Sequence, residues 1–396
     1  MNRHRLTLTI VVILGAWLLA ACGGDPEAET PAAGAQDGAA AGQTAEAGGA
    51  SAAPGEASAT PGEASAAPDS LEELLAYDGD DRQAVLEAGA MEEGRMMLYT
   101  TSVLEGVIEP LLAAFKEEYP FIEVQVHRDG SAEIAARILE EYAAGRHDVD
   151  VVELEPGQLS ELYNLEHIVP FYTPEAEAFS EEALGIDNAW ITTRESHYGV
   201  GYNTQALSES EIPKTVEDLL DERWQGEIAL SPGTGVRWLG AYVENGYEDV
   251  MKGLADQDVT VHNVSGRALV DLVISGEVLL NPHANYAHVM VSKEAGAPLE
   301  WAPLEPTFIS TGALAMPAEP ANPHAALLWI DYALSEEGQQ IYVDQSYHVR
   351  REGLEDAVGE VDYETIPEPT VEPGESYNDL YTTWDQMFTE MFIEGS

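Results

Sequence analysis

The sequence predicts an α/β protein of two lobes, each a mostly parallel sheet flanked by helices. Strand patterns alternate with amphipathic helix patterns along the chain. In the first such unit, at 95–115, a short apolar run is followed by small hydroxyl residues and then by apolar residues at helical spacing. Two similar units follow at 121–142 and 148–165. Three successive βα units predict a parallel sheet with right-handed crossovers.

The length of the folded part favours two lobes over a single core. It begins near residue 71 and contains roughly 325 residues, more than one hydrophobic core commonly serves. We expect the first lobe at 71–202, the second lobe at 203–310 and a return to the first lobe at 311–354. An acidic, proline-containing tail at 355–396 carries Tyr and Trp residues, which we expect to dock on the body.

The first 21 residues have the features of a secretory signal. Arg3 and Arg5 are followed by an apolar run that is too short for a comfortable membrane span. Cys22 comes directly after Leu-Ala-Ala and resembles the lipid-bearing first mature residue of a bacterial lipoprotein. We therefore expect a signal peptide at 1–21 and a lipid on Cys22. The alternative is a plain secretory signal with a chance cysteine. As Cys22 is the only cysteine, the chain has no internal disulfide and no thiolate metal cluster.

Residues 22–70 predict a disordered tether. From residue 23 to residue 70 there is no aromatic residue, Lys or Arg, and Pro-Gly-Glu-Ala-Ser-Ala occurs at 54–59 and again at 61–66. Such a segment has no side chains from which to build a core. A coil of this length reaches about 35–40 Å, which lets the folded part stand off a membrane.

The charge of the chain excludes some partners and suggests a habitat. Lys and Arg number 17 against 72 Asp and Glu, a formal net charge of −55. Nucleic acid is excluded as a partner, because phosphate binding needs a basic face. An acidic, lysine-poor surface suits high salt, where screening relieves self-repulsion. We expect halophilic adaptation; the alternative is an ordinary acidic, soluble chain.

The sequence lacks the motifs of common enzyme classes. It contains no HExxH, no GxSxG, no P-loop and no Cys–His couple. The glycine-rich turn at 231–235 is not a dinucleotide fingerprint, since Trp238 stands where the third glycine belongs. We expect the chain not to be an enzyme.

Polar residues gather where the predicted strands end, and ligands of open α/β sheets bind beyond those ends. Ser131 is also a candidate helix N-cap. Arg237 either clamps an anionic group with two hydrogen bonds or pairs with one of the many acids. His283 and His288, five residues apart, do not share a helix face and are expected to be ordinary loop histidines. The candidate ligand-binding residues are Thr101, Ser102, Ser131, Glu155, Thr234, Gly235, Arg237, Asn285 and Tyr286, the last two on a loop at 281–286.

Five separated segments carry a resemblance to a known family. In order, they are AYDGDDRQAVLEAGAMEEGRMMLYTT at 76–101, FKEEYPFIEVQV at 115–126, GYNT at 201–204, IPKTVEDLLDERWQGEIAL at 212–230 and TGALAMPAEPANPHAALLWIDYALSEEGQQIY at 311–342. Together they resemble the bacterial extracellular solute-binding lipoproteins of ABC importers, family 1 type, in particular the ferric-iron-binding ones. The resemblance implies the periplasmic-binding-protein type II fold, in which two α/β lobes joined by two crossing strands close on a solute.

The resemblance also implies a ligand set. Ferric members of the family hold iron with hard oxygen ligands, including two adjacent tyrosines after a second-lobe strand, and phenolate and carboxylate oxygens suit such a cation. Here Tyr286 matches one tyrosine, with Asn285 and Ala287 beside it, and Glu155 matches the acidic ligand. The family's histidine in the first strand-end loop is replaced by Val103 or a neighbour. The implied metal ligands are therefore Glu155 and Tyr286.

The function implied by the resemblance is the capture of ferric iron, free or chelated, and its delivery to an ABC permease. Iron would be the transported ligand, and no resident cofactor is expected. The alternatives are a small organic or phosphorus-containing anion bound by the same fold, and a solute sensor without transport. We expect an extracytoplasmic monomer, periplasmic or on the cell surface, held at the membrane by the lipid on Cys22.

The lipid anchor leads to a first prediction. Cys22→Ser should move the protein from the membrane fraction to the soluble fraction, because each buried acyl CH₂ contributes about 0.8 kcal/mol to anchoring. Fractionation followed by immunoblotting measures the change, and circular dichroism should show an unaltered folded part. Unchanged membrane retention of the variant contradicts the anchor.

The acidic composition leads to a second prediction. Stability should rise with added salt, because screening weakens repulsion among the excess carboxylates. Thermal melts from low to molar sodium chloride measure this rise. A melting temperature that stays flat over that range argues against halophilic adaptation.

Overall fold

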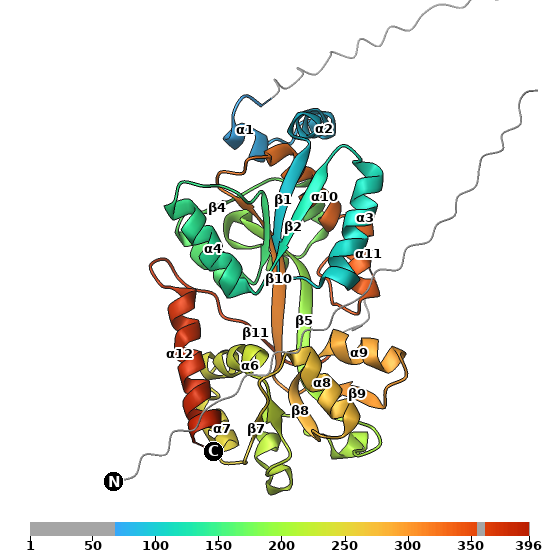
Figure 1. The fold of residues 1–396 in the computed structure, drawn as a ribbon, viewed down its shortest axis with the longest axis vertical. Helices are drawn as coiled ribbons and strands as arrows, with labels where there is room; N and C mark the ends of the chain where they lie inside the picture. The colour runs from blue at the N-terminus through green and yellow to red at the C-terminus, as the bar shows by residue number, and fades with distance from the viewer. Residues whose placement is uncertain (1–67, 355–360, 396) are drawn as a thin grey trace, which may run out of the picture. The chain divides into compact units, whose positions relative to one another are not determined.

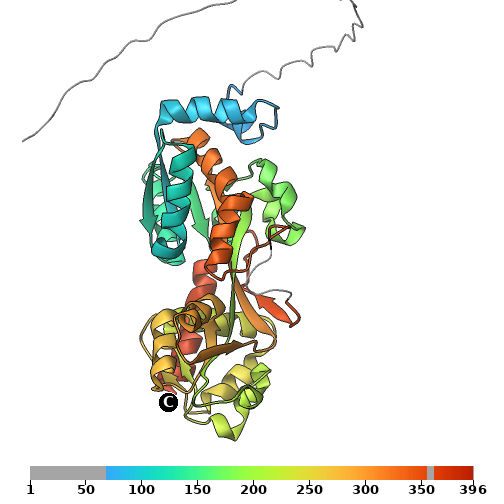
Figure 2. The ribbon, with the colours of Figure 1, turned by 90° about the vertical axis from the view of Figure 1, so that its right-hand side faces the viewer.

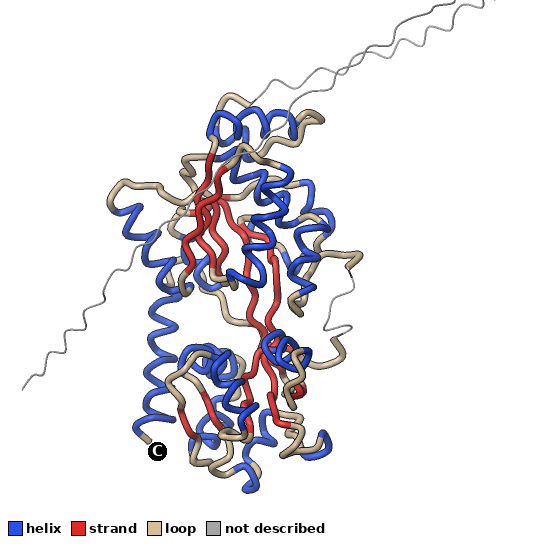
Figure 3. The backbone as a smooth tube through the Cα atoms, turned by 45° about the vertical axis from the view of Figure 1, so that its right-hand side comes forward, coloured by secondary structure: helices blue, strands red, loops and turns tan. Residues whose placement is uncertain are grey.

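Two long strands, β5 (Trp190–Asn203) and β10 (Thr307–Pro317), cross between the two lobes of the computed structural model (Figure 1). The structure describes residues 68–354 and 361–395. The expected signal peptide, Cys22 and the tether up to residue 67 lie outside these ranges. β5 and β10 pair antiparallel, with a register shift between Gly312 and Ala313, and Figure 3 shows them running through both helix-covered halves. Within the described ranges, no helix has both the length and the hydropathy needed to cross a membrane.

The first lobe is a sheet whose centre is parallel. β1 pairs in parallel with β2 and with β3, and β3 pairs antiparallel with β10, which confirms the predicted run of βα units. The elements of this part are α1 (Leu71–Leu75), α2 (Arg82–Glu93), β1 (Arg95–Thr100), α3 (Glu109–Glu118), β2 (Glu123–Arg128), α4 (Ser131–Ala143), β3 (Val151–Leu154), α5 (Pro156–Asn164) and β4 (Ile168–Val169).

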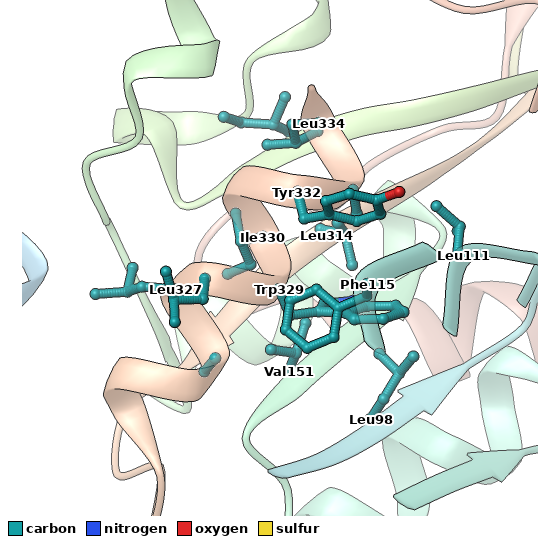
Figure 4. Packing of buried hydrophobic residues seen from close by; sticks show 14 of the residues in the cluster. Leu98, Leu111, Phe115, Val151, Leu314, Leu327, Trp329, Ile330, Tyr332 and Leu334 are labelled. Atoms are coloured by element: carbon teal, nitrogen blue, oxygen red, sulfur yellow. The ribbon is translucent and has the colours of Figure 1, made fainter. Parts of the chain in front are cut away.

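Two helices from late in the sequence complete the first lobe. α10 (Pro323–Leu334) and α11 (Glu336–Asp344) return to lie beside α3, and α10 also packs on α2 (Figure 2). Trp329 of α10 lies edge-on to Phe115 of α3, with ring centroids 5.1 Å apart. Leu98 and Val151 of the sheet belong to the same core (Figure 4). Apolar residues far apart in sequence thus form one buried layer between helices and sheet.

The second lobe has a mixed sheet, not the mostly parallel one that the sequence predicts. β8 and β9 both run antiparallel to β5, and the short pair β6–β7 is parallel. The overall α/β class is nevertheless the predicted one. The elements here are β6 (Ala229–Leu230), α6 (Pro232–Glu244), α7 (Glu248–Ala255), β7 (Thr260–Val261), α8 (Gly266–Ser275), β8 (Leu280–Asn285), α9 (Tyr286–Glu294) and β9 (Leu299–Ala302).

The prediction of a loop at 281–286 is wrong. Five of its six residues belong to β8, and Tyr286 begins α9. The ladder shifts register between Gly199 and Gly201 of β5, where Pro282 lies on the facing strand. Because proline has no N–H to donate, it fits a strand at such an irregular position. The proline and the polar composition of this segment therefore mislead the sequence reading.

The described part of the tail packs against the rest of the protein. β11 (Thr365–Pro367) pairs in parallel with β10, and α12 (Tyr377–Thr389) lies along α6 (Figure 1). A β-carbon at Gly240 of α6 would lie 2.2 Å from the ring of Trp384, so only glycine allows this close approach. Trp384 is fully buried there and donates its indole N–H to Glu244.

A buried ion network joins the tail to both lobes. Arg237 of α6 places Nη1 3.3 Å from Glu155 Oε1, 3.2 Å from Glu368 Oε2 and 3.1 Å from the hydroxyl of Ser310. Glu155 precedes α5, Ser310 lies in β10, and Glu368 follows β11. Burial raises the pKa of Glu155, while the charge of Arg237 acts to lower it. Of the two roles left open for Arg237 by the sequence, pairing with acids is the one present in the structure.

The network leads to a third prediction. Arg237→Gln should lower the free energy of unfolding at neutral pH by about 3–5 kcal/mol, because it leaves buried carboxylates without their cation. The pKa of Glu155 is already raised in the folded state and should rise further in the variant. Stability linked to a raised pKa is present below the ordinary pKa and is lost as pH rises.

The difference between Arg237→Gln and wild type should therefore be smaller at about pH 4 than at about pH 8. Urea unfolding at the two pH values measures it. Arg146→Gln, which breaks an exposed pair with Asp148, serves as the control and should cost about 0–1 kcal/mol. A loss for Arg237→Gln as small as this control contradicts the assignment.

Candidate functional site

A cavity of about 750 Å³ lies between the two lobes. From the first lobe it is lined by the turn after β1, the end of β2 and the segment after α11. From the second lobe it is lined by the N-terminal ends of α6, α8 and α9. The lining residues that matter most for its chemistry are Arg128, Tyr347, Thr234, Arg267, His283 and Asn285.

Arg128 is the cation that the first lobe presents to the cavity. It is the last residue of β2, and its side chain is exposed. Within residues 68–354 and 361–395, its side chain has no hydrogen-bond or ion-pair partner, although its backbone pairs with β1. Burial raises the pKa of Tyr347, another lining residue, and the charge of Arg128 is among those that lower it. Tyr347 therefore keeps its phenol proton at neutral pH as a hydrogen-bond donor near Arg128.

Three helices of the second lobe begin at the cavity. The N-terminal end of a helix carries partial positive charge and attracts anions. Asn285 caps α9 by accepting from the Ala287 N–H at 2.9 Å, whereas α6 begins without a side-chain cap. Arg267 in the first turn of α8 donates to the backbone oxygen of His288 at 2.7 Å and lies 3.5 Å from Asp271. Because Arg267 is paired with Asp271, the positive character of this wall comes mainly from the helix ends.

Two histidines in the lining are neutral at physiological pH. Burial lowers the pKa of His283 to about 4, and burial followed by the charge of Arg267 lowers that of His288 to about 4. His283 Nε2 accepts a hydrogen bond from the backbone N–H of Ser231 at 3.2 Å, which puts the ring proton on Nδ1. That Nδ1 has no partner among the described residues. His283 and His288 were predicted to be ordinary loop histidines, and this prediction is wrong. His283 lies in β8, and both residues line the cavity.

Among the described lining residues, Glu105 is the single carboxylate. It is exposed in the short π-helix at Leu104–Ile108 that precedes α3. The lining thus carries two guanidinium groups and three helix N-termini against one acid, in a chain with a net charge of −55. The lining therefore carries a much smaller share of acidic residues than the chain as a whole.

The structure brings only two of the predicted site residues into the lining, namely Thr234 and Asn285. Thr101 and Ser102 instead hold Arg194, whose Nη2 lies 2.9 Å from Thr101 Oγ1 and whose Nε lies 3.0 Å from Ser102 Oγ. Ser102 also donates to Glu153 at 2.9 Å. These strand-end hydroxyls serve a buried charge pair because Arg194 of β5 passes over them.

The other predicted residues also lie elsewhere. Ser131 is the first residue of α4 and not its N-cap, a position that Gly130 takes. Gly235 faces the tail, since a β-carbon there would lie 2.8 Å from Phe388. Tyr286 packs edge-on to Trp301 with ring centroids 5.2 Å apart. Neither Glu155 nor Tyr286, the two expected iron ligands, is among the cavity's lining residues.

Arg128 and Tyr347 were not among the site residues predicted from the sequence, and His283 was predicted to be an ordinary loop residue. A signal for Arg128 was present, because it directly ends the second predicted strand and so stands at the ligand-binding edge of the sheet. His283 and Tyr347 gave no such signal, since their positions depend on the irregular β5–β8 pairing and on the return of the chain after α11.

Comparison with known proteins shows which family and which folds the chain is similar to. Residues 166–360 match the bacterial extracellular solute-binding protein family. An uncharacterized protein of Haemophilus influenzae is 28% identical over 285 residues, which cover 65% of this chain and 80% of that protein. The structure is similar to iron-bound HitA from Pseudomonas aeruginosa, with a TM-score of 0.61, 19% identity and coverage of 74% of this chain and 98% of HitA.

It is also similar to AfuA from Actinobacillus pleuropneumoniae, solved with exogenous fructose-6-phosphate bound, with a TM-score of 0.61, 20% identity and coverage of 76% and 99%. The matched family is one of transport components, not a class of enzymes, and its members carry a transported solute instead of a resident cofactor. Its extracellular character implies a periplasmic or surface location. The described part of the chain has the two-lobed fold of type II periplasmic binding proteins, and residues 166–360 match the bacterial extracellular solute-binding protein family.

Proposed function

We propose that this chain is the solute-binding component of an ABC importer and that it binds a small anionic solute in the cavity between its lobes. The observation that carries the proposal is Arg128. In a chain with 72 acidic residues, this arginine lines the cavity and has no acidic partner within the described ranges. A guanidinium group donates in pairs to carboxylate or phosphate oxygens, which is the use that such an unpaired arginine offers.

The opposite wall supports the same ligand class. The N-termini of α6, α8 and α9 and the guanidinium of Arg267 lie across the cavity from Arg128. The Nδ1–H of His283 and the hydroxyl of Tyr347 supply neutral donors. An anion held between Arg128 on one lobe and the helix ends on the other favours lobe closure, because the closed form brings both sets of donors to it.

The size of the cavity favours an organic anion over a bare ion. Small-molecule sites commonly measure about 300–1,000 Å³, and the cavity of about 750 Å³ falls in that range. A sugar phosphate of the kind bound in the AfuA structure has both the size and the charge. We assign the anionic group to Arg128 and the uncharged part of the solute to the tyrosine, histidine and amide side chains of the lining.

Ferric iron is the second candidate, favoured by the likeness to iron-bound HitA. Free iron would require Glu155 and Tyr286, yet Glu155 is engaged by Arg237 and neither residue lines the cavity. Iron held by a carboxylate chelator is different, because the complex presents anionic oxygens to the same donors. A ferric chelate therefore fits this cavity better than the bare cation.

The proposal includes the setting of the protein. A lipid on Cys22 and the tether would hold the binding domain near its permease as a monomer outside the cytoplasm, in a high-salt habitat. A solute sensor without a permease remains the alternative role for the same site. Deletion of a permease gene should abolish solute uptake if the chain serves transport.

The fourth prediction tests the anion site. Fructose-6-phosphate or inorganic phosphate should raise the melting temperature of the wild-type chain, and Arg128→Gln should weaken binding about 10–100-fold by removing a charged hydrogen-bond donor. Isothermal titration calorimetry measures the change. Arg95→Gln is the matched control, because Arg95 is an exposed arginine at the other end of the neighbouring strand β1.

A titration with ferric iron shows whether the anion proposal should be replaced by direct iron binding. Titration with ferric chloride should give no phenolate-to-iron charge-transfer band in the wild-type chain. A band that disappears in Tyr286→Phe and is unchanged in Arg128→Gln would replace the anion proposal with direct iron binding.

A further inference from the structure

We propose a second site, for a divalent cation of the zinc type, at the strands that cross between the lobes. Its ligands are Glu195 and His197 of β5 and His348 from the segment after α11. One ligand atom from each of these residues lies within 4.8 Å of the other two. None of the three lines the cavity between the lobes, so this site is separate from the one for the solute.

Two of the three separations between the ligand atoms fit tetrahedral coordination, and all three lie within 4.8 Å. Glu195 Oε2 lies 3.5 Å from His197 Nε2 and 3.5 Å from His348 Nε2. Bonds of about 2.0–2.1 Å in a tetrahedral zinc site place neighbouring ligand atoms roughly 3.3–3.5 Å apart. Two imidazole nitrogens and one carboxylate oxygen form a common zinc set, with the fourth position taken by water.

In metal sites, a ligand residue commonly makes a hydrogen bond through its other polar atom, and this bond fixes the orientation of the ligand. The proposed ligands have hydrogen-bond partners of this kind. His197 Nδ1 lies 2.9 Å from the Tyr363 hydroxyl, and donation from Nδ1 leaves Nε2 unprotonated for a metal. Arg350 Nε donates to Glu195 Oε1 at 2.7 Å and leaves Oε2 available. The backbone N–H of Glu195 donates to the His348 carbonyl at 2.7 Å, which fixes the two segments together.

The simpler interpretation is a metal-free cluster held by polar contacts alone, and the burial of His197 argues against it. The side chain of His197 is 2% exposed, and its Nε2 makes no hydrogen bond among the described residues although Glu195 Oε2 is 3.5 Å away. A buried polar nitrogen without a partner costs free energy that metal coordination would offset. The local charge also favours a bound cation. The two carboxylates of Glu195 and Glu182 carry more charge than the single guanidinium group of Arg350, which contacts both.

A cation at this place would act on the hinge. It would join β5 to the segment after α11, and through Tyr363 to the start of the described tail. Lobe closure in two-lobed binders requires changes in the crossing strands. The bound cation would therefore stiffen the hinge and stabilise the fold, without entering the solute cavity.

The experiment is titration of the full chain with zinc chloride in molar sodium chloride, followed by calorimetry and thermal melting. We expect one tightly bound zinc ion per chain and a raised melting temperature. Magnesium chloride should give neither, because magnesium prefers oxygen ligands and binds only to scattered carboxylates. Cobalt(II) should give visible absorption bands of a tetrahedral site with nitrogen ligands.

Variants locate the ion. His197→Gln and His348→Gln should each weaken zinc binding at least about tenfold and abolish the cobalt bands. His147→Gln, a partly exposed histidine beside Glu319, is the matched control and should change neither. If His197→Gln does not fold, His348→Gln, with a side chain 18% exposed, carries the test. Absence of tight zinc binding in the wild type, or its persistence in His348→Gln, overturns the proposal.

Discussion

The antiparallel pairing of β5 with β10 is the constraint on which the rest of the structure depends. β5 is buried along its whole length and carries charged side chains into the interior, among them Arg194. Gly312 faces Arg194 across the ladder, and a β-carbon there would lie 2.3 Å from the guanidinium. The glycine thus lets Arg194 lie over β10 and reach Glu153, 3.7 Å away. Because a buried charge must be fully paired and hydrogen-bonded, the surrounding hydroxyls are committed to it.

Because these hydroxyls hold a buried charge, some predictions from the sequence were right and others were wrong. The alternation of strand and helix patterns was local information, so it predicted the βα units and placed Thr101 and Ser102 correctly at a strand end. Their role was not local. Arg194 lies 92 residues beyond Ser102, and Glu368 lies 131 residues beyond Arg237. No periodicity in a single sequence reveals which distant charge a polar side chain will meet, so residues expected to face a solute were found holding buried ions.

The second lobe shows a different limit. Strand β8 contains Pro282 and polar residues, which by composition favour a loop, yet the irregular ladder with β5 accommodates them. Tertiary pairing overrode local preference there and carried His283 into the cavity wall. Thr234 and Asn285 do line the cavity, and each lies at the start of a helix, although only the helix after the glycine-rich turn at 231–235 was predicted from the sequence.

In so acidic a chain, an arginine is best interpreted by what neutralises it. Arg194 and Arg237 each contact buried carboxylates, so their charge is neutralised within the fold. Arg128 has no such partner in the described ranges and stands at the cavity. An anionic solute approaching the protein meets long-range repulsion from the acidic surface, and the repulsion weakens as the Debye length falls from about 10 Å at 0.1 M salt to about 3 Å at 1 M. Contacts with Arg128 and the helix ends act at hydrogen-bond distance and are screened much less. High salt therefore removes the barrier to an anion more than it weakens the site, so an acidic surface and an anion-binding cavity are compatible in one protein.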